Sequence, residues 1–438
     1  MADDAAAVGV GALRLRRSLA YVLAFACMGL AVGSCGPALP VVRARVGARL
    51  ALAFGLRGLG GVVGSLAGGL ALQRFRKGGH AVVAAGAMAC AVAAASIPHV
   101  RSVAGAAAAL VLLDAGCGLL QSANTLVMWA QPKERHTFWL NALNGVFGGG
   151  SLTAPLLVAT VAAAFRVSHA AAVGRAAAAA AVAAVAAAVG LLPIPSPTQP
   201  DNAAPGDGGD RAAARTLATV QPHVRLLQIV GTAFALNASV GAETTTGAFV
   251  EAYVVGQQER YGRLAAIGER ERDLLASGFW MSFTFGRVAC AVALHRFERA
   301  FEQGGAELAL FLQAGLALFG ALLVLALPAS HAALWIGVLC VGAGVAGLVA
   351  GFLAQIARLL TVTGNVTAAT SMGVMTGVSL WQTIATLTGP DAMMQVVGTA
   401  LLSALLIQLA FVAHARSPKR DAAAYETDLD HTPLLSEA

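Results

Sequence analysis

The chain has 438 residues, of which 58% are hydrophobic and 12% are charged, and its formal net charge is +7. Soluble domains carry about 25% charged residues, so this composition excludes an ordinary soluble domain. Apolar runs of about 20 residues recur along the whole length, which predicts an all-α membrane protein. The basic residues stand in short clusters between these runs, which indicates membrane orientation and no nucleic-acid partner.

Cysteine usage and the N-terminus exclude further classes. The six cysteines all lie in apolar runs without a CxxC pair, so we expect neither a disulfide framework nor a zinc site. Asp3 and Asp4 argue against an organelle transit peptide, and the first apolar run is too long for the core of a signal peptide.

The apolar runs predict twelve transmembrane helices. The first six cover Leu19–Gly36, Leu50–Leu72, Ala81–Pro98, Val103–Ala123, Trp139–Ala163 and Ala170–Leu192. The other six cover Leu226–Val254, Leu274–Leu294, Leu308–Leu327, Ala333–Leu359, Val366–Leu387 and Val396–His414. The sixth run is nearly pure alanine, and we retain it because an odd number of spans would place the termini on opposite sides of the membrane.

A polar stretch divides these helices into two sets. Residues 193–222 are rich in Pro, Gly and Asp, which predicts a disordered linker. The expected organisation is a cytosolic N-tail (1–18), a six-helix bundle (19–192), this cytosolic linker, a second six-helix bundle (223–415) and a cytosolic tail (416–438). Six plus six helices around a long polar loop is the architecture of the major facilitator fold.

The basic residues predict the orientation. With both termini and the linker on one side, that side holds 17 of the 29 lysines and arginines, the other side holds 10, and two lie inside spans. The richer side is expected to be cytosolic.

Arg57 lies in the second predicted helix, in which Gly60, Gly64 and Gly68 share one face and allow close helix packing. A lone arginine at the bilayer centre costs about 2.5–3.5 kcal/mol on an insertion scale. Arg57 should therefore face protein or water, either paired with Asp114 or extended toward the membrane surface.

The fourth predicted helix carries Asp114, followed toward the cytosol by Gln121 and Asn124. A buried carboxylate indicates either a coupling-ion site or half of a structural ion pair. The amides suit a hydroxyl-rich ligand, because they donate and accept hydrogen bonds, but they also join helices to one another. In the fifth helix, Asn141 and Asn144 share a face, and a glycine run weakens the helix.

The seventh predicted helix places Asn237 and Glu243 beside three threonines, which is a poor surface for lipid. It predicts a broken helix whose polar part faces a cavity. In the eighth helix, Trp280, Thr284 and Arg287 share a face toward another helix or a substrate path. We expect a half-buried Arg287 that reaches cytosolic carboxylates such as Glu298 and acts as a latch at an inner gate, with substrate contact as the less favoured alternative.

Several of these motifs resemble one transporter family. The second-helix arginine and glycines, "GPALP" (36–40), Asn124 with Trp129, "GAET" (241–244) and "FWMSFTFGR" (279–287) are similar to the sodium-dependent glucose transporter-like branch of the major facilitator superfamily. Fucose permeases are more distant relatives. The resemblance implies a twelve-helix transporter that works by alternating access, with hexose-type sugars as the best-known substrates.

Two departures from that family affect the expected coupling. Leu120 stands where these relatives carry an acidic residue four positions before the fourth-helix asparagine, and Gln73 replaces an acidic residue of the following loop. Asp114 or Glu243 would then have to couple transport to Na⁺ or H⁺, or transport is uncoupled.

The C-terminal tail adds a sorting motif. Asp430 with Leu434 and Leu435 is similar to an acidic dileucine signal, which cytosolic adaptor proteins recognise at plasma or endosomal and vacuolar membranes.

The sequence thus predicts a carrier of a small solute in the lipid bilayer, with no enzyme activity, metal or cofactor. A hexose-like sugar is favoured, with another organic solute or a non-transporting receptor or scaffold as alternatives. The expected substrate-binding residues are Asn124, Gln121, Asn141, Asn144, Asn237, Trp280 and Gln382. The expected coupling or gating residues are Asp114, Glu243, Arg57 and Arg287.

Overall fold

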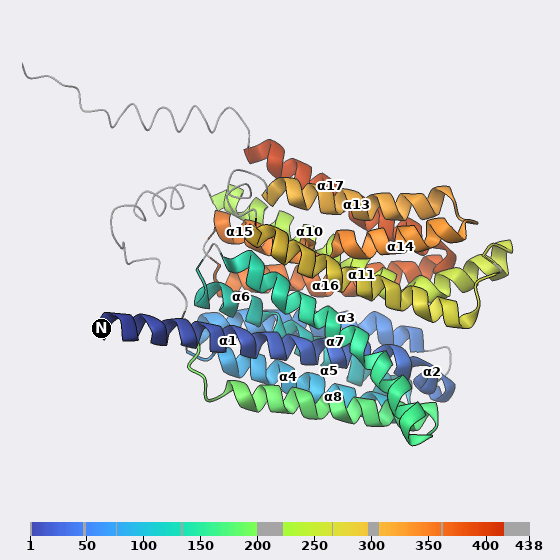
Figure 1. The fold of residues 1–438 in the computed structure, drawn as a ribbon, viewed down its shortest axis with the longest axis horizontal. Helices are drawn as coiled ribbons and strands as arrows, with labels where there is room; N and C mark the ends of the chain where they lie inside the picture. The colour runs from blue at the N-terminus through green and yellow to red at the C-terminus, as the bar shows by residue number, and fades with distance from the viewer. Residues whose placement is uncertain are drawn as a thin grey trace, which may run out of the picture.

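The structure is a computed structural model, in which residues 2–46, 50–75, 77–132, 135–198, 222–264, 266–296, 306–360 and 362–415 are described. Long α-helices form most of these ranges (Figure 1). The first group is α1 (Ala2–Gly33), α2 (Cys35–Val46), α3 (Leu50–Arg74), α4 (Gly79–Ser96), α5 (Val103–Leu120), α6 (Ser122–Ala130), α7 (His136–Phe165) and α8 (His169–Leu191). The second group is α10 (Pro222–Tyr261), α11 (Glu269–Arg296), α13 (Ala306–Ala326), α14 (His331–Val345), α15 (Leu348–Leu359), α16 (Gly364–Thr388) and α17 (Met393–Ala415).

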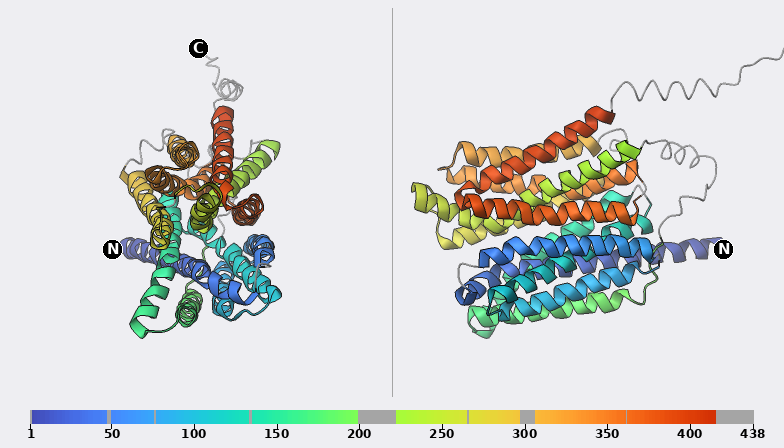
Figure 2. Two further views of the ribbon diagram at one scale, coloured as in Figure 1. Left: turned by 90° about the vertical axis from the view of Figure 1, so that its right-hand side faces the viewer. Right: turned by 180° about the vertical axis from the view of Figure 1, so that it is seen from behind.

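The two groups form two bundles that lie side by side (Figures 1 and 2). In the first bundle, α3 packs on α5 and α1 on α7, and in the second, α10 packs on α16 and α17. The most extensive contacts between the bundles are those of α3 with α16 and of α7 with α11. The predicted boundary at residues 193–222 stays a prediction, because 199–221 lie outside the described residues.

Ten helical segments in the described ranges are long and apolar enough to cross a membrane. They include His169–Leu191, the alanine-rich sixth predicted span. The long helices α10 and α16 are not among these ten segments, and both carry many polar residues. Because α10 and α16 pack on each other, their polar side chains are shielded from lipid.

The start of α1, the end of α8, the start of α10 and the end of α17 lie at the same end of the molecule, which we call the terminal end (Figure 1). The opposite end is called the far end. At the terminal end, the Arg17 Nε donates a hydrogen bond of 2.7 Å to the carbonyl oxygen of Pro195, which follows α8. At the far end, serine side chains cap the starts of α5, α8 and α14, namely Ser102, Ser168 and Ser330.

Glycines on two faces of α3 let it pack closely in both directions. A Cβ at Gly60 or Gly64 would overlap the backbone of α5. On the other face, a Cβ at Gly61 would lie 2.7 Å from Met375 of α16, and one at Gly69 would lie 2.5 Å from the carbonyl oxygen of Gly364. The predicted glycine face is therefore a packing surface within the first bundle, and a second face packs against the other bundle.

The predicted break in the seventh helix is wrong, because α10 is continuous over 40 residues. Thr244 and Thr246 donate to the carbonyl oxygens four residues before them, whereas the buried Thr245 hydroxyl has no hydrogen-bond partner among the described residues. The helix interruptions lie elsewhere, at Gln121 between α5 and α6 and at Ala346 and Gly347 between α14 and α15.

The structure also changes the predicted bounds of the first helix. The predicted N-tail is largely helical, because α1 begins at Ala2, and "GPALP" lies inside α2 and does not end the first helix. The glycine run of the fifth span does not interrupt α7, which is helical from His136 to Phe165.

Candidate functional site

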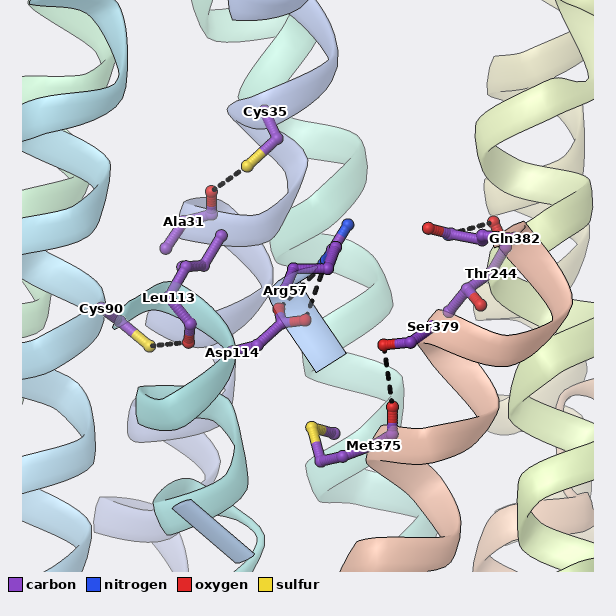
Figure 3. A network of polar contacts seen from close by, with 10 residues as sticks. All are labelled: Ala31, Cys35, Arg57, Cys90, Leu113, Asp114, Thr244, Met375, Ser379 and Gln382. Carbon is purple, nitrogen blue, oxygen red and sulfur yellow. Dashed lines mark hydrogen bonds and ion pairs between the residues drawn. The ribbon is translucent and has the colours of Figure 1, made fainter. Parts of the chain in front are cut away.

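The first feature is a buried ion pair between α3 and α5. Arg57 Nε and Nη2 each donate to one carboxylate oxygen of Asp114, both at 2.8 Å (Figure 3). Both side chains are buried. This two-bond geometry satisfies both carboxylate oxygens. The predicted pairing of Arg57 with Asp114 is therefore present, and the alternative in which Arg57 extends to the membrane surface is not.

The ion pair faces the second bundle. Ser379 and Gln382 of α16 lie opposite Arg57 and Asp114, with Thr244 of α10 behind them (Figure 3). The helices approach so closely here that a Cβ at Gly58 would overlap the Ser379 side chain. The pair thus lies at the contact between the two bundles.

A second polar cluster joins α10 to α16. The Asn237 amide nitrogen donates to Thr376 Oγ1, and its oxygen accepts from the indole of Trp381, both at 2.9 Å. The Trp381 ring lies against Gly241, where any side chain would overlap it. Gln382 donates to the Thr244 carbonyl oxygen at 3.1 Å. The predicted residues Asn237 and Gln382 therefore lie in neighbouring contacts on one pair of helices.

The third feature is a looser ion pair between Glu243 of α10 and Arg287 of α11. Arg287 Nη2 lies 3.5 Å from Glu243 Oε2, and the side chains are 1% and 5% exposed. The guanidinium also lies 4.3 Å from the centre of the Phe283 ring, a cation–π distance. Among the described residues, the Arg287 Nε and Nη1 have no hydrogen-bond partner.

The expectation of a half-buried Arg287 is wrong, because its side chain is fully buried. Among the described residues it pairs with the carboxylate of Glu243 on the neighbouring helix, and Glu298, the expected cytosolic partner, lies outside the described residues. One reason for the burial is that α11 continues to Arg296, beyond the predicted end at Leu294, which places Arg287 deeper in the bundle.

The face of the eighth predicted helix that carries Trp280, Thr284 and Arg287 packs against two other helices, α10 and α7. The Trp280 ring lies against Gly247 of α10, while Thr284 and Arg287 lie against Gly148 and Gly145 of α7. Trp280 packs edge-on against Phe279 and Phe283.

The two asparagines of α7 have different surroundings. Asn144 is buried and donates to the Leu140 carbonyl oxygen of its own helix at 2.8 Å. Asn141 lines a cavity of about 250 Å³ between α7 and the helices α11, α13 and α15. Cys290, Gln313, Gln355 and Arg358 also line this cavity. It lies beside the Arg287 region, because Cys290 follows Arg287 by three residues.

The remaining predicted amides, Asn124 and Gln121, are buried in the first bundle next to a contact between the two bundles that the sequence did not predict. Asn124 donates to Gln121 at 2.7 Å in the first bundle. The next residue, Thr125, forms a hydrogen bond of 2.6 Å with Thr367 of the second bundle, and Trp129 donates to the Val362 carbonyl oxygen at 3.0 Å. These two bonds join the bundles at the terminal end, near α6 and α15 (Figure 1).

The predicted sorting residues Asp430, Leu434 and Leu435 lie outside the described residues. Within the described ranges, no three His, Cys, Asp or Glu side chains gather closely enough to hold a metal ion.

The sequence matches no protein-family model and no curated protein. Solved structures, however, match its fold. Two structures of FucP, one described as the E. coli fucose:proton symporter and one in the outward conformation, have TM-scores of 0.64 and 0.65, at 16% and 14% identity, over 89% of this chain and 97% of FucP. The human organic anion transporter MFSD10 (TETRAN) has a TM-score of 0.65, at 14% identity, over 90% of this chain and 99% of that one.

The proton:xylose symporter XylE, bound to 6-bromo-6-deoxy-D-glucose, has a TM-score of 0.67, at 11% identity, over 92% of this chain and 96% of XylE. All three proteins match over nearly their full length, and such low identities establish the fold alone. The closer resemblance to the glucose transporter-like branch stays a prediction. The chain is therefore a multi-pass membrane protein with the fold of the major facilitator superfamily.

Proposed function

We propose that this protein is a membrane transporter that moves a small solute by alternating access. The observation that carries the proposal is the burial of charged and amide side chains at and beside the contact between the two bundles, with Arg57 and Asp114 opposite Ser379 and Gln382 (Figure 3). Polar groups at membrane depth are costly, and their gathering between two bundles is typical of a solute path. The sequence gives no support for an enzyme.

A hexose-like sugar is the favoured substrate class. Amides such as Asn237 and Gln382 can exchange their present hydrogen bonds for bonds to sugar hydroxyls. Trp381 of α16 and Trp280 of α11, which both lie against α10, offer aromatic rings nearby. Two of the structurally similar proteins are described as sugar:proton symporters. A different organic solute, or a receptor or scaffold without transport, is the alternative.

Glu243 is the better candidate than Asp114 for coupling to H⁺ or Na⁺. Asp114 uses both oxygens in short hydrogen bonds to Arg57, so a proton or cation would have to break a strong pair. Glu243 is held at 3.5 Å by one contact to Arg287, and a bound proton or sodium ion could replace that contact at lower cost. Besides Glu243, the described titratable group that interacts electrostatically with Arg287 is Cys290.

The terminal end is proposed to be cytosolic, because it holds the larger share of basic residues. The hydrogen bonds of Thr125 and Trp129 close the bundles at that end, so the conformation would be closed toward the cytosol. An adaptor that reads the dileucine motif would place the protein at the plasma membrane or at endosomal and vacuolar membranes.

Reconstitution into liposomes tests the proposal. Uptake of labelled hexoses would be measured without a gradient, with a pH gradient and with a sodium gradient, against empty liposomes as control. We expect saturable uptake that an inward proton or sodium gradient increases. Absence of saturable uptake for every monosaccharide tried would remove the sugar claim, and normal transport by a Glu243→Gln variant under a gradient would remove the coupling role.

A further inference from the structure

Arg287 is a buried cation whose hydrogen bonding is incomplete. It is 1% exposed, its contact to Glu243 is longer than a hydrogen bond between charged groups, and its Nε and Nη1 have no partner among the described residues. A buried charged donor without a partner is costly, so such groups are normally satisfied by protein, water or a ligand.

The other buried arginine shows that the fold can satisfy this group fully. Arg57 reaches Asp114 through two bonds of 2.8 Å, whereas Arg287 has a carboxylate within 3.5 Å and a ring face at 4.3 Å. The Phe283 ring lies at a cation–π distance from the guanidinium but is not a hydrogen-bond partner of Nε or Nη1. Arg287 therefore has two donors, Nε and Nη1, that a ligand can still bind.

A cavity of about 250 Å³ lies one helical turn away from Arg287, lined by Asn141 and Cys290. Arg287 does not itself line this cavity, whose charged lining residues are Glu307 and Arg358, so a solute held there reaches Arg287 only by extending one turn along α7 and α11. Gly145 of α7 lies beside the aliphatic part of the Arg287 side chain, because a Cβ at Gly145 would lie 3.5 Å from the Arg287 Cβ. Typical small-molecule pockets measure about 300–1,000 Å³, so this cavity lies just below that range and limits a ligand to a small compound. The Oε1 atoms of Gln313 and Gln355 are also buried without a hydrogen-bond partner among the described residues, and both side chains line the cavity.

We propose that Arg287 binds a carboxylate of the transported solute, so that the substrate class is a hydroxylated organic anion such as a sugar acid. The guanidinium offers planar, permanently charged donors that match a carboxylate, and nearby amides offer bonds to hydroxyls. This inference rests on the proposed transport function and narrows its substrate class. The structurally similar human protein is described as an organic anion transporter, but at 14% identity that similarity shows the fold alone.

Binding to the purified full-length protein in lipid nanodiscs tests the inference with three probes: glucose, glucuronate and succinate. Glucose and glucuronate share a ring and differ in the carboxylate, whereas succinate carries carboxylates without the ring. We expect glucuronate to bind about 10- to 100-fold more tightly than glucose, which is the effect of a hydrogen bond to a charged group. The readout is calorimetry, with labelled uptake into liposomes as the second measurement.

Variants assign the effect to Arg287. Arg287→Lys should lose most of the preference for glucuronate over glucose, because an ammonium lacks the planar fork. The double variant Glu243→Gln with Arg287→Gln removes both charges and so avoids an unpaired buried carboxylate, and it should bind the two sugars equally. Arg260→Gln, at an exposed arginine of the far end, is the matched control and should retain the wild-type preference.

The outcomes separate this inference from the proposed function. Equal binding of glucose and glucuronate by the wild type, or a preference that persists in the double variant, overturns the inference while transport stands. Arg287-dependent binding of succinate without binding of glucuronate supports the carboxylate site and rejects the sugar class. Absence of binding and uptake for all three probes overturns the inference, and the hexose gradient assay above then decides the transport function independently.

Discussion

Asp114 holds the Arg57 charge inside the first bundle through two short hydrogen bonds. We predict that Asp114→Asn lowers the free energy of unfolding by about 3–5 kcal/mol, because it leaves a buried guanidinium without its counter-charge. The measurement is the thermal unfolding midpoint of the purified protein in detergent, followed by the fluorescence of a thiol-reactive dye as the buried cysteines become exposed.

The matched control is the ion pair between Arg260 and Asp391 at the far end, which has a similar distance of 2.7 Å but an arginine that is 63% exposed. Arg260→Gln should change stability by about 0–1 kcal/mol, because solvent screens exposed pairs. Equal effects of the two substitutions would show that burial does not decide the strength of the Arg57 pair.

The residue scale also shows what the sequence could predict. Charge inside an apolar run is visible in the sequence, so the burial of Arg57, Asp114 and Glu243 and the first pairing were predictable. The partner of Arg287 was not, because the pairing depends on how α10 and α11 rotate toward each other. Thr376, which binds Asn237, was also missed, although the hydroxyl-rich sequence of α16 carried a signal.

Among the helices, α3 depends on glycine for its contact with α5. We predict that Gly64→Ala destabilises the protein by about 1–3 kcal/mol, because the new Cβ would overlap the Ala115 carbonyl oxygen and force the helices apart. Gly174→Ala in α8 is the control, since a Cβ there has open space and alanine favours the helix. Thermal unfolding should rank the variants in that order, and a neutral Gly64→Ala would contradict the close contact.

At the far end, Glu271 of α11 bridges to α14 by accepting hydrogen bonds from Trp335 and His331. These bonds lower the pKa of the Glu271 carboxyl below its ordinary value. The folded pKa is thus below the unfolded pKa of about 4.3, so the stabilisation is present above that pH and is lost as the pH falls through the folded pKa. Glu271→Gln should reduce the loss of stability between about pH 5 and pH 3.

That prediction is checked by thermal unfolding of wild type and variant across the same pH series. Glu259→Gln, at an exposed carboxylate of α10, serves as control and should keep the wild-type pH dependence. A Glu271→Gln variant whose stability falls with acid as steeply as that of the wild type would exclude this bridge as the cause.

Helix positions were more predictable than helix continuity. Apolar length gave the approximate bounds of α3, α8 and α17, because the bilayer thickness limits a span. Continuity depends on tertiary packing that the sequence does not show: α10 stays unbroken although Thr244 and Thr246 bond back to their own helix, a contact that slightly destabilises helices. The interruption at Gln121 was not predictable, because neither glycine nor proline stands at that position.

Considered as a whole, the molecule consists of two bundles held together by different kinds of contact. Glycine faces join α3 to α16, because small residues let the two helix backbones approach closely. The hydrogen bonds of Thr125 with Thr367 and of Trp129 with Val362 fix the terminal end. For a transporter that alternates, these bonds must break in each cycle, and breaking them opens that end.

A disulfide at the terminal end should therefore stop transport without unfolding the protein. The hydroxyl oxygens of Thr125 and Thr367 lie 2.6 Å apart, so cysteines at both positions can reach disulfide distance. We predict that Thr125→Cys with Thr367→Cys loses nearly all uptake after oxidation and regains it with a reductant. The measurement is solute uptake into liposomes, in a background where the six native cysteines are replaced.

The matched control places a disulfide within one bundle. A Cβ at Gly68 of α3 would lie 2.6 Å from the Ser122 hydroxyl of α6, and both residues belong to the first bundle. Cysteines at positions 68 and 122 should form a disulfide that leaves uptake unchanged, because the bundles remain free to move relative to each other. If the Thr125–Thr367 disulfide forms and uptake continues, the terminal end does not open during transport, and the solute must leave by a path that does not separate α6 from α16.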